Sequence, residues 1–227
     1  MAQHLDLEEQ EQLAELKHFW SRYGNLISWT LIVVFGAIAA YNGWNYWQRH
    51  QSAQASALFE EVERASQSGD LARVQRAFDD MKGQYGGTAY AQQAGLLAAK
   101  TLVDGGKPDE AKTALSWVAE KASDEGYQAV ARLRLAAVLA EAKSYDEALK
   151  QVSGAFPKDF EALAADRRGD ILQLQGKKNE ARAEFAKALK GLDERAEYRR
   201  LVEVKLNALG GDPAGAPAAP SQGTTKP

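Results

Sequence analysis

Residues 163–189 read LAADRRGDILQLQGKKNEARAEFAKAL, and this stretch decides the fold. Two segments rich in helix-forming residues flank the turn former Gly176. Gly169 and Ala181 are small enough to let two helices approach closely, and Phe185 can fill the groove beside that contact. The stretch therefore predicts a hairpin of two helices joined by a short turn.

The same unit occurs twice more, upstream of this stretch. Three triplets each open a predicted helix, and their alanines lie 37 and 33 residues apart. A small residue stands twelve positions before each alanine, and a bulky apolar residue stands four positions after it. The triplets are Asp109-Glu110-Ala111, Asp146-Glu147-Ala148 and Asn179-Glu180-Ala181; the small residues are Ala99, Ala136 and Gly169; the bulky residues are Leu115, Val152 and Phe185. This periodicity predicts a stack of helical hairpins.

Turn formers divide the rest of the chain into helical segments of similar length. The breaks are Ser68-Gly69-Asp70, Gly86-Gly87-Thr88, Gly105-Gly106-Lys107-Pro108, Ser123-Asp124-Glu125-Gly126, Lys143-Ser144, Phe156-Pro157 and Gly176-Lys177. Each combines turn residues or a helix start signal. No long stretch alternates with a period of two, so the sequence predicts no strands.

The repeat resembles the tetratricopeptide repeat, a helical hairpin of about 34 residues. The opening tryptophan and the closing proline of that consensus are missing, so the repeats are degenerate. Ser52–Met81 keeps Phe78 but has Val74 in place of the alanine, and we predict that it caps one end. Glu194–Leu209 is predicted to cap the other end, because a solenoid must not expose its apolar interior.

An uncharged stretch precedes the repeats. No charged residue occurs between Arg22 and Arg49, and a helix of about 22 residues would rise about 33 Å, close to the thickness of the hydrocarbon core of a bilayer. Aromatic rings and arginines at its two ends are expected at the headgroup level, in contact with membrane lipid. These interface anchors are Trp20, Arg22, Trp44, Tyr46, Trp47 and Arg49. We therefore predict one transmembrane helix over residues 25–47.

Two questions about this stretch stay open. Ala37-Ile38-Ala39 matches the small-x-small pattern of a signal peptide, although the preceding segment is long and acidic and the apolar run continues past this point. Lys17 and Arg22 before the span balance Arg49 and Arg64 after it, so charge does not decide the orientation.

The predicted organisation has four parts: an N-terminal segment (1–24), the transmembrane helix (25–47), the repeat domain (48–209) and a tail (210–227). The tail is rich in Gly, Ala, Pro, Ser and Thr, and we expect it to be disordered. The predicted fold class is all-α, with a single transmembrane helix followed by a degenerate tetratricopeptide-like helical repeat solenoid.

The repeat domain lacks the residues that most catalytic sites need. The three histidines, His4, His18 and His50, lie in or beside the anchor, and the chain has no cysteine. Histidine-dependent triads, cysteine nucleophiles and ordinary zinc sites are therefore excluded from the repeats. No phosphate-binding or dinucleotide-binding motif occurs, and no basic cluster suggests nucleic acid. We expect a non-enzyme without cofactor, metal or small-molecule substrate; a hydrolase that uses carboxylates alone is the open alternative.

Several stretches together resemble the YfgM family, the ancillary subunits of the bacterial SecYEG translocon. They are Leu16-Lys17-His18-Phe19-Trp20, Gly43-Trp44-Asn45-Tyr46-Trp47, Leu133-Arg134-Leu135-Ala136 and Ala165-Asp166-Arg167-Arg168-Gly169-Asp170. The similarity runs from about Glu8 to Leu209, and the tail departs from the shorter ending of the family.

The resemblance implies a bacterial inner-membrane protein with a cytoplasmic N-terminus and a periplasmic repeat domain. It implies SecYEG and a PpiD-type periplasmic chaperone as partners, and a role in passing translocated polypeptides to periplasmic chaperones. The alternative is an envelope-stress regulator that acts through its cytoplasmic segment, where Leu13, Leu16 and Trp20 lie along one helical stripe. On the repeats, Arg132, Arg134, Arg167, Arg168 and Tyr127 are candidates for a partner surface, although solvation explains exposed arginines equally well.

Overall fold

The computed structural model describes residues 7–211, which form nine α-helices and no strand. The helices are α1 (Leu7–Ser68), α2 (Leu71–Tyr85), α3 (Ala89–Asp104), α4 (Pro108–Lys121), α5 (Glu125–Glu141), α6 (Tyr145–Val152), α7 (Lys158–Leu174), α8 (Lys178–Gly191) and α9 (Glu197–Ala208). The all-α fold class is confirmed. The chain divides into two compact units, residues 1–51 and residues 52–227. The predicted tail, 210–227, lies almost entirely outside the described residues.

The described part of the first unit is the beginning of α1. Within residues 7–211, α1 is the one helix that is long and apolar enough to cross a membrane. Its aromatic side chains pair along the helix surface: the ring centroids of Phe19 and Tyr23 lie 5.1 Å apart, and those of Trp44 and Trp47 lie 5.3 Å apart. Most of the apolar side chains between these pairs are exposed, as the lipid-facing side chains of a membrane helix would be.

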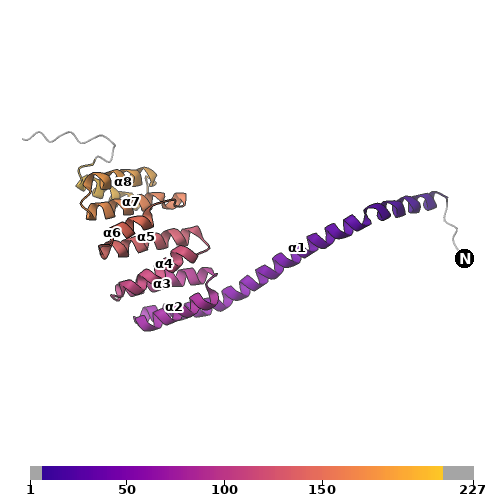
Figure 1. The fold of residues 1–227 in the computed structure, drawn as a ribbon, viewed down its shortest axis with the longest axis horizontal. Helices are drawn as coiled ribbons and strands as arrows, with labels where there is room; N and C mark the ends of the chain where they lie inside the picture. Colours follow the sequence, from indigo (N-terminus) through magenta and orange to yellow (C-terminus); the bar gives the residue numbers. More distant parts are fainter. Residues whose placement is uncertain (1–6, 212–227) are drawn as a thin grey trace, which may run out of the picture. The chain divides into compact units, whose positions relative to one another are not determined.

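The second unit is a stack of helical hairpins (Figure 1). We call the end of α1 (residues 52–68), α3, α5, α7 and α9 the A helices, and α2, α4, α6 and α8 the B helices. Each B helix from α4 onward packs against the A helices before and after it, and α5 also contacts the A helices α3 and α7. A continuous core runs from the end of α1 to α7, and a second cluster of buried residues joins α7, α8 and α9.

Every A helix ends in the same turn. One residue at its end has a positive φ, and the amide of the following residue donates to the carbonyl five positions earlier, at N···O distances of 2.7–3.1 Å. The residues with positive φ are Gly69, Gly106, Lys143, Gly176 and Gly210. This is the Schellman motif, which satisfies the last carbonyls of a helix and favours glycine at the left-handed position. Because all five turns match, any residue of an A helix can be located by counting back from this position.

Lys143 is the non-glycine residue in this set, with φ of 61°. A side chain with a Cβ atom in the left-handed region costs about 1 kcal/mol, a cost that glycine does not have. We expect Lys143→Gly to raise the free energy of unfolding by about 0.5–1 kcal/mol. Chemical denaturation in detergent micelles, followed by circular dichroism, measures this change. The matched control is Lys100→Gly, in the interior of α3, which should lose about 1 kcal/mol; a loss in both variants would contradict the argument.

The small residues of the repeat lie in the interior between the helices. Ala99, Ala136 and Gly169 are buried, each seven positions before the left-handed residue that ends its helix. A Cβ atom on Gly169 would lie 2.5 Å from Cε1 of Phe185, so the ring packs directly against the backbone of α7. The contact predicted from residues 163–189 is therefore confirmed.

The short helix α6 leaves a loop that one arginine holds in place. The guanidinium of Arg132 on α5 donates to the carbonyls of Gln151, Ser153 and Ala155, each at 2.9 Å. The guanidinium carbon also lies 3.9 Å from the ring centroid of Phe156, a cation–π distance. Arg132 thus satisfies carbonyls that the early end of α6 leaves without partners within the helix.

Candidate protein-binding site

The A helices present one continuous surface, which we call the A face. Its positions are counted back from the residue with positive φ that ends each A helix: nine, six and two positions before it. These positions differ by three and four residues, so their side chains lie on one side of the helix. From α1 to α9, the positions nine before are Glu60, Leu97, Arg134, Arg167 and Leu201; six before are Glu63, Lys100, Ala137, Asp170 and Val204; two before are Gln67, Asp104, Glu141, Leu174 and Ala208.

Two hollows lie along the first part of the A face. One, of about 510 Å³, lies between the end of α1 and α3, and the other, of about 320 Å³, lies between α3 and α5 and reaches α7. Lys100 and Asp104 line both hollows, so the two are adjacent. The second has an apolar floor that includes Val103 and Val138. A row of shallow hollows on parallel helices suits an extended or helical protein segment.

Charges of both signs border these hollows. Lys100 Nζ lies 2.6 Å from Asp104 Oδ2, and Arg167 Nη1 lies 3.6 Å from Asp170 Oδ2. Arg134 donates through Nη1 to the carbonyl of Leu96 on α3, at 3.2 Å. An exposed pair such as Lys100 and Asp104 contributes little to stability, so these two side chains can exchange one partner for another at small cost.

An ionic cluster beneath the A face attaches α9 to α7. Asp166 on α7 is 1% exposed and accepts hydrogen bonds from Tyr198 Oη at 2.6 Å and from Lys205 Nζ at 2.9 and 3.0 Å. Lys205 Nζ also lies 2.7 Å from Asp170 Oδ1. Buried charges of this kind need their partners, because an uncompensated charge in the interior is costly. Burial raises the pKa of the Tyr198 hydroxyl, and the hydrogen bond to Asp166 and the charges of Asp166 and Asp170 raise it further.

The pKa of Asp170 is raised, first by burial and then by the nearby Asp166, although Lys205 opposes the shift. A carboxyl group whose pKa is higher in the folded state takes up a proton more readily there, so its contribution to stability rises as the pH falls from neutral through that pKa. Glu61, Asp109, Glu110 and Glu184 have lowered pKa values and act in the opposite sense, in the range below about 4.5.

We therefore expect Asp170→Asn to remove a stabilisation that the wild type gains as the pH falls from neutral toward 3.8, the ordinary pKa of aspartate. Urea midpoints measured at several pH values in this range give the result. Asp109→Asn is the control, because the pKa of Asp109 is lowered, mainly by a hydrogen bond from Lys112, and its effect lies at lower pH. An unchanged pH profile in Asp170→Asn would contradict the assignment.

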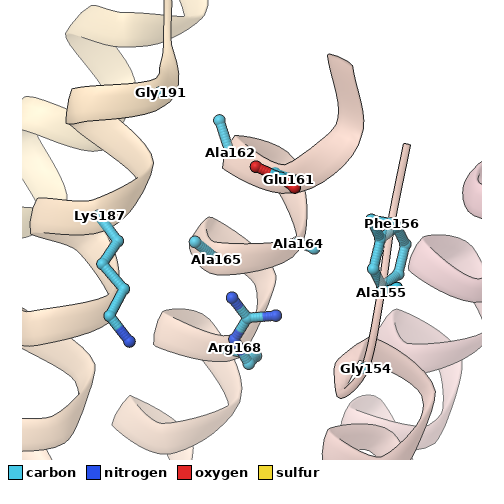
Figure 2. Close-up of a pocket in the computed structure, with 10 residues that line it drawn as sticks. All are labelled: Gly154, Ala155, Phe156, Glu161, Ala162, Ala164, Ala165, Arg168, Lys187 and Gly191. Atoms are coloured by element: carbon cyan, nitrogen blue, oxygen red, sulfur yellow. The ribbon is translucent and has the colours of Figure 1, made fainter. Parts of the chain in front are cut away.

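A further hollow lies on the other side of α7, between α8 and the loop after α6 (Figure 2). Its volume is about 310 Å³, and its lining includes Phe156, Ala165, Arg168 and Lys187. Arg168 donates through Nε to Glu184 at 2.8 Å and through Nη1 to the carbonyl of Val152 at 2.6 Å. This arginine therefore connects α7 to α6 and α8, and it does not lie on the A face.

The candidate partner residues from the sequence thus separate into two groups. Arg134 and Arg167 lie on the A face and line its second hollow. Arg132 and Arg168 hold main-chain carbonyls around α6, and Tyr127 accepts a hydrogen bond from Gln93 Nε2 at 2.7 Å. The contacts of Arg132, and that of Arg168 with α6, could not be found from sequence spacing, because their acceptors are backbone carbonyls.

The six predicted interface anchors all lie on α1, and their side chains are exposed. Gly24 lies against the indole ring of Trp20, where a Cβ atom would be 3.1 Å from Nε1. Among the described residues, no group of three or more histidine or acidic side chains is placed to hold a metal ion.

The fold and the A face define the class of this protein: a tetratricopeptide-like helical repeat protein with one helix of membrane-spanning length. A family described as a tetratricopeptide repeat-like domain matches residues 17–211. The chain is also similar to proteins named ancillary SecYEG translocon subunit. That of Neisseria gonorrhoeae is 31% identical over 213 residues, which cover 92% of this chain and 100% of the relative. That of Escherichia coli is 28% identical, over 88% of this chain and 96% of the relative.

The likeness extends over both the long apolar helix and the repeats, and a third relative, from Haemophilus influenzae, is 28% identical over 206 residues. This chain therefore belongs to the YfgM family of ancillary SecYEG translocon subunits.

Proposed function

We propose that this chain is a non-catalytic subunit that associates with the SecYEG translocon and binds protein segments through its A face. The observation that carries the proposal is the row of adjoining hollows, across parallel A helices, with an apolar floor and exchangeable charges at its border. The relatives, which are named for the translocon, support the choice of partner.

We further propose that residues 25–47 span the inner membrane, with residues 1–24 in the cytoplasm and the repeats from residue 48 in the periplasm. Trp20, Arg22, Trp44, Tyr46, Trp47 and Arg49 are the proposed anchors at the two interfaces. The aromatic pairs at both ends of the apolar stretch support this placement. In this arrangement the A face meets translocated polypeptides and a PpiD-type chaperone, and one membrane anchor keeps it at high effective concentration near the channel.

Co-isolation with SecYEG in mild detergent tests the role of the A face. Ala137 lies six positions before Lys143 and lines the second hollow together with Arg134 and Arg167, so Ala137→Arg would place a long side chain in it. We expect this variant to retain several-fold less SecYEG than the wild type. The matched control is Ala183→Arg, on an exposed position of α8, away from the A face. Equal retention by all three proteins would show that the A face does not bind the translocon.

A second test concerns orientation. A cysteine introduced at Lys190 should react with a membrane-impermeant thiol reagent added to intact cells with a permeable outer membrane, because the natural chain has no cysteine. Labelling only after lysis would place the repeats in the cytoplasm and would contradict the proposal.

A further inference from the structure

Large apolar side chains are exposed at one end of the repeat domain. Among the described residues from 52 onward, four large hydrophobic side chains are more than about a third exposed: Leu174 (58%), Tyr198 (37%), Leu201 (50%) and Val204 (59%). Three of them belong to α9, and Leu174 is the last residue of α7. The other exposed large hydrophobics of the described chain lie between Leu13 and Trp47, on α1.

The register of the A helices places these side chains on the A face. Leu201 corresponds to Arg134 and Arg167, nine positions before the left-handed residue. Val204 corresponds to Lys100 and Asp170 of the earlier A helices, and Leu174 to Asp104 and Glu141. The A face is therefore charged over α3 and α5 and apolar over α9 and the end of α7.

By the same correspondence, Leu174 and Leu201 occupy the positions of two residue pairs that line a common hollow earlier in the stack. Asp104 and Arg134, the equivalent pair one step earlier, line one hollow, and so do Glu141 and Arg167. The contact between Asp170 and Lys205, 2.7 Å from Oδ1 to Nζ, confirms that α7 and α9 are neighbours in the stack. We call Leu174, Leu201 and Val204 the apolar end of the A face.

Packing within the domain does not explain these residues. The side chains that α9 buries are Val202 and Leu206, on its other side. Residues 212–227, which follow α9, contain no large apolar residue that could cover the apolar end. Two copies joined through a helix of 12 residues, about 18 Å long, would bury less than the roughly 1,200 Å² typical of a stable dimer. The apolar end is instead continuous with the hollows of the A face, and this continuity points to a segment of another protein.

We infer that the apolar end binds large apolar side chains of a partner protein segment that lies along the A face, with its charged residues over α3 and α5. Neighbouring A helices lie about 10 Å apart, so the path from α3 to α9 measures about 30 Å, the length of about nine extended residues. A segment of this kind has its leucine, valine or phenylalanine side chains grouped at one end and polar or charged residues at the other. This inference rests on the proposed function of the A face and adds the sequence character of what binds there.

Binding of labelled peptides to the full-length chain in lipid nanodiscs tests the inference. The probes are two fluorescent peptides of about 14 residues and equal composition, one with its leucines grouped at one end and the other with its leucines scattered among charged residues. We expect the grouped peptide to bind with a dissociation constant on the order of 10–100 µM and the scattered peptide to bind several-fold more weakly. Both directions of the grouped sequence are tested, since the chain direction of the bound segment is open.

The variant Leu201→Ser/Val204→Ser removes exposed groups only, so it should fold, and we expect it to weaken binding of the grouped peptide by about tenfold or more. The matched control, Lys190→Ser, on the exposed surface of α8, should bind like the wild type. Loss of binding in Ala137→Arg with full binding in Leu201→Ser/Val204→Ser would preserve the proposed function and overturn this inference.

Three other outcomes would also overturn it. Absence of binding by the wild type would do so, whatever the co-isolation with SecYEG shows. Tighter peptide binding after deletion of residues 212–227 would identify the tail as the occupant of the apolar end. A wild-type dimer in sedimentation, converted to a monomer by Leu201→Ser/Val204→Ser, would identify a second copy of the chain.

Discussion

Phe185→Ala is expected to lower the free energy of unfolding of the repeat domain by about 3–5 kcal/mol. Phe185 is fully buried in the cluster that joins α7, α8 and α9, and its ring packs against the backbone at Gly169. Alanine at this position would leave a cavity. The cavity cannot close, because the other contacts between α7 and α8 keep the two helices at their present distance. Chemical denaturation of the full-length chain, followed by circular dichroism, measures the loss.

The contact between Gly169 and Phe185 can be tested separately from the cavity. Gly169→Ala should destabilise the wild type, because its Cβ atom would lie 2.5 Å from the ring. In a Phe185→Leu background the same change should cost much less, since the smaller side chain leaves room for the methyl group. The control for Phe185→Ala is Phe160→Ala, which also removes an aromatic ring. Phe160 is only partly buried, so its loss should lower the free energy of unfolding less. Equal effects of Gly169→Ala in both backgrounds would contradict the contact.

Asp166→Ala is also expected to lower the free energy of unfolding strongly, by about 3 kcal/mol. The change removes the acceptor of the Tyr198 hydroxyl and one of the two carboxylates that face Lys205. The effect should concentrate in α9, because Tyr198 and Lys205 make its polar contacts with α7. Hydrogen exchange should therefore show faster exchange of the α9 amides, with smaller changes in α3 and α4.

The control for this prediction is Asp159→Ala, at an exposed position near the start of the same helix. It should leave the exchange of α9 unchanged. Asp166→Asn is an informative intermediate, because the amide can still accept from Tyr198 but does not neutralise Lys205. If Asp166→Ala destabilised all helices equally and left α9 no more open than the rest, the cluster would not be the attachment of α9.

The hairpins were predictable because the spacing of small and bulky residues repeats along the chain, and helix packing imposes this spacing. Gly169, Ala181 and Phe185 recur as small, small and bulky residues at constant spacing, and close packing of two helices constrains these positions in every unit. The breaks between helices were predictable from turn formers such as Gly106 and Gly176, because few residues other than glycine accept a positive φ. At Lys143 the break was predicted, but the left-handed conformation was not, because lysine carries no signal for it.

The attachment of α9 shows what the sequence left open. Asp166 and Lys205 are 39 residues apart, and in a helical stretch rich in charges nothing distinguishes these two residues from solvated ones. The same holds for Arg132, whose acceptors are three backbone carbonyls in a loop. The resemblance to the family did single out residues 165–170, and the structure explains why that segment is distinctive: its side chains contact α6, α8 and α9.

By itself, the sequence determined the helical class, the apolar stretch of membrane-spanning length and the period of the repeats, because these follow from local hydrophobicity, turn chemistry and residue size. The tertiary structure alone decided which face of each A helix is exposed. That choice depends on the rotation of every helix against its neighbours, which the shared left-handed turns and the buried ionic cluster set together. The apolar end formed by Leu174, Leu201 and Val204 became visible only once that rotation was known, because side chains far apart in sequence form it.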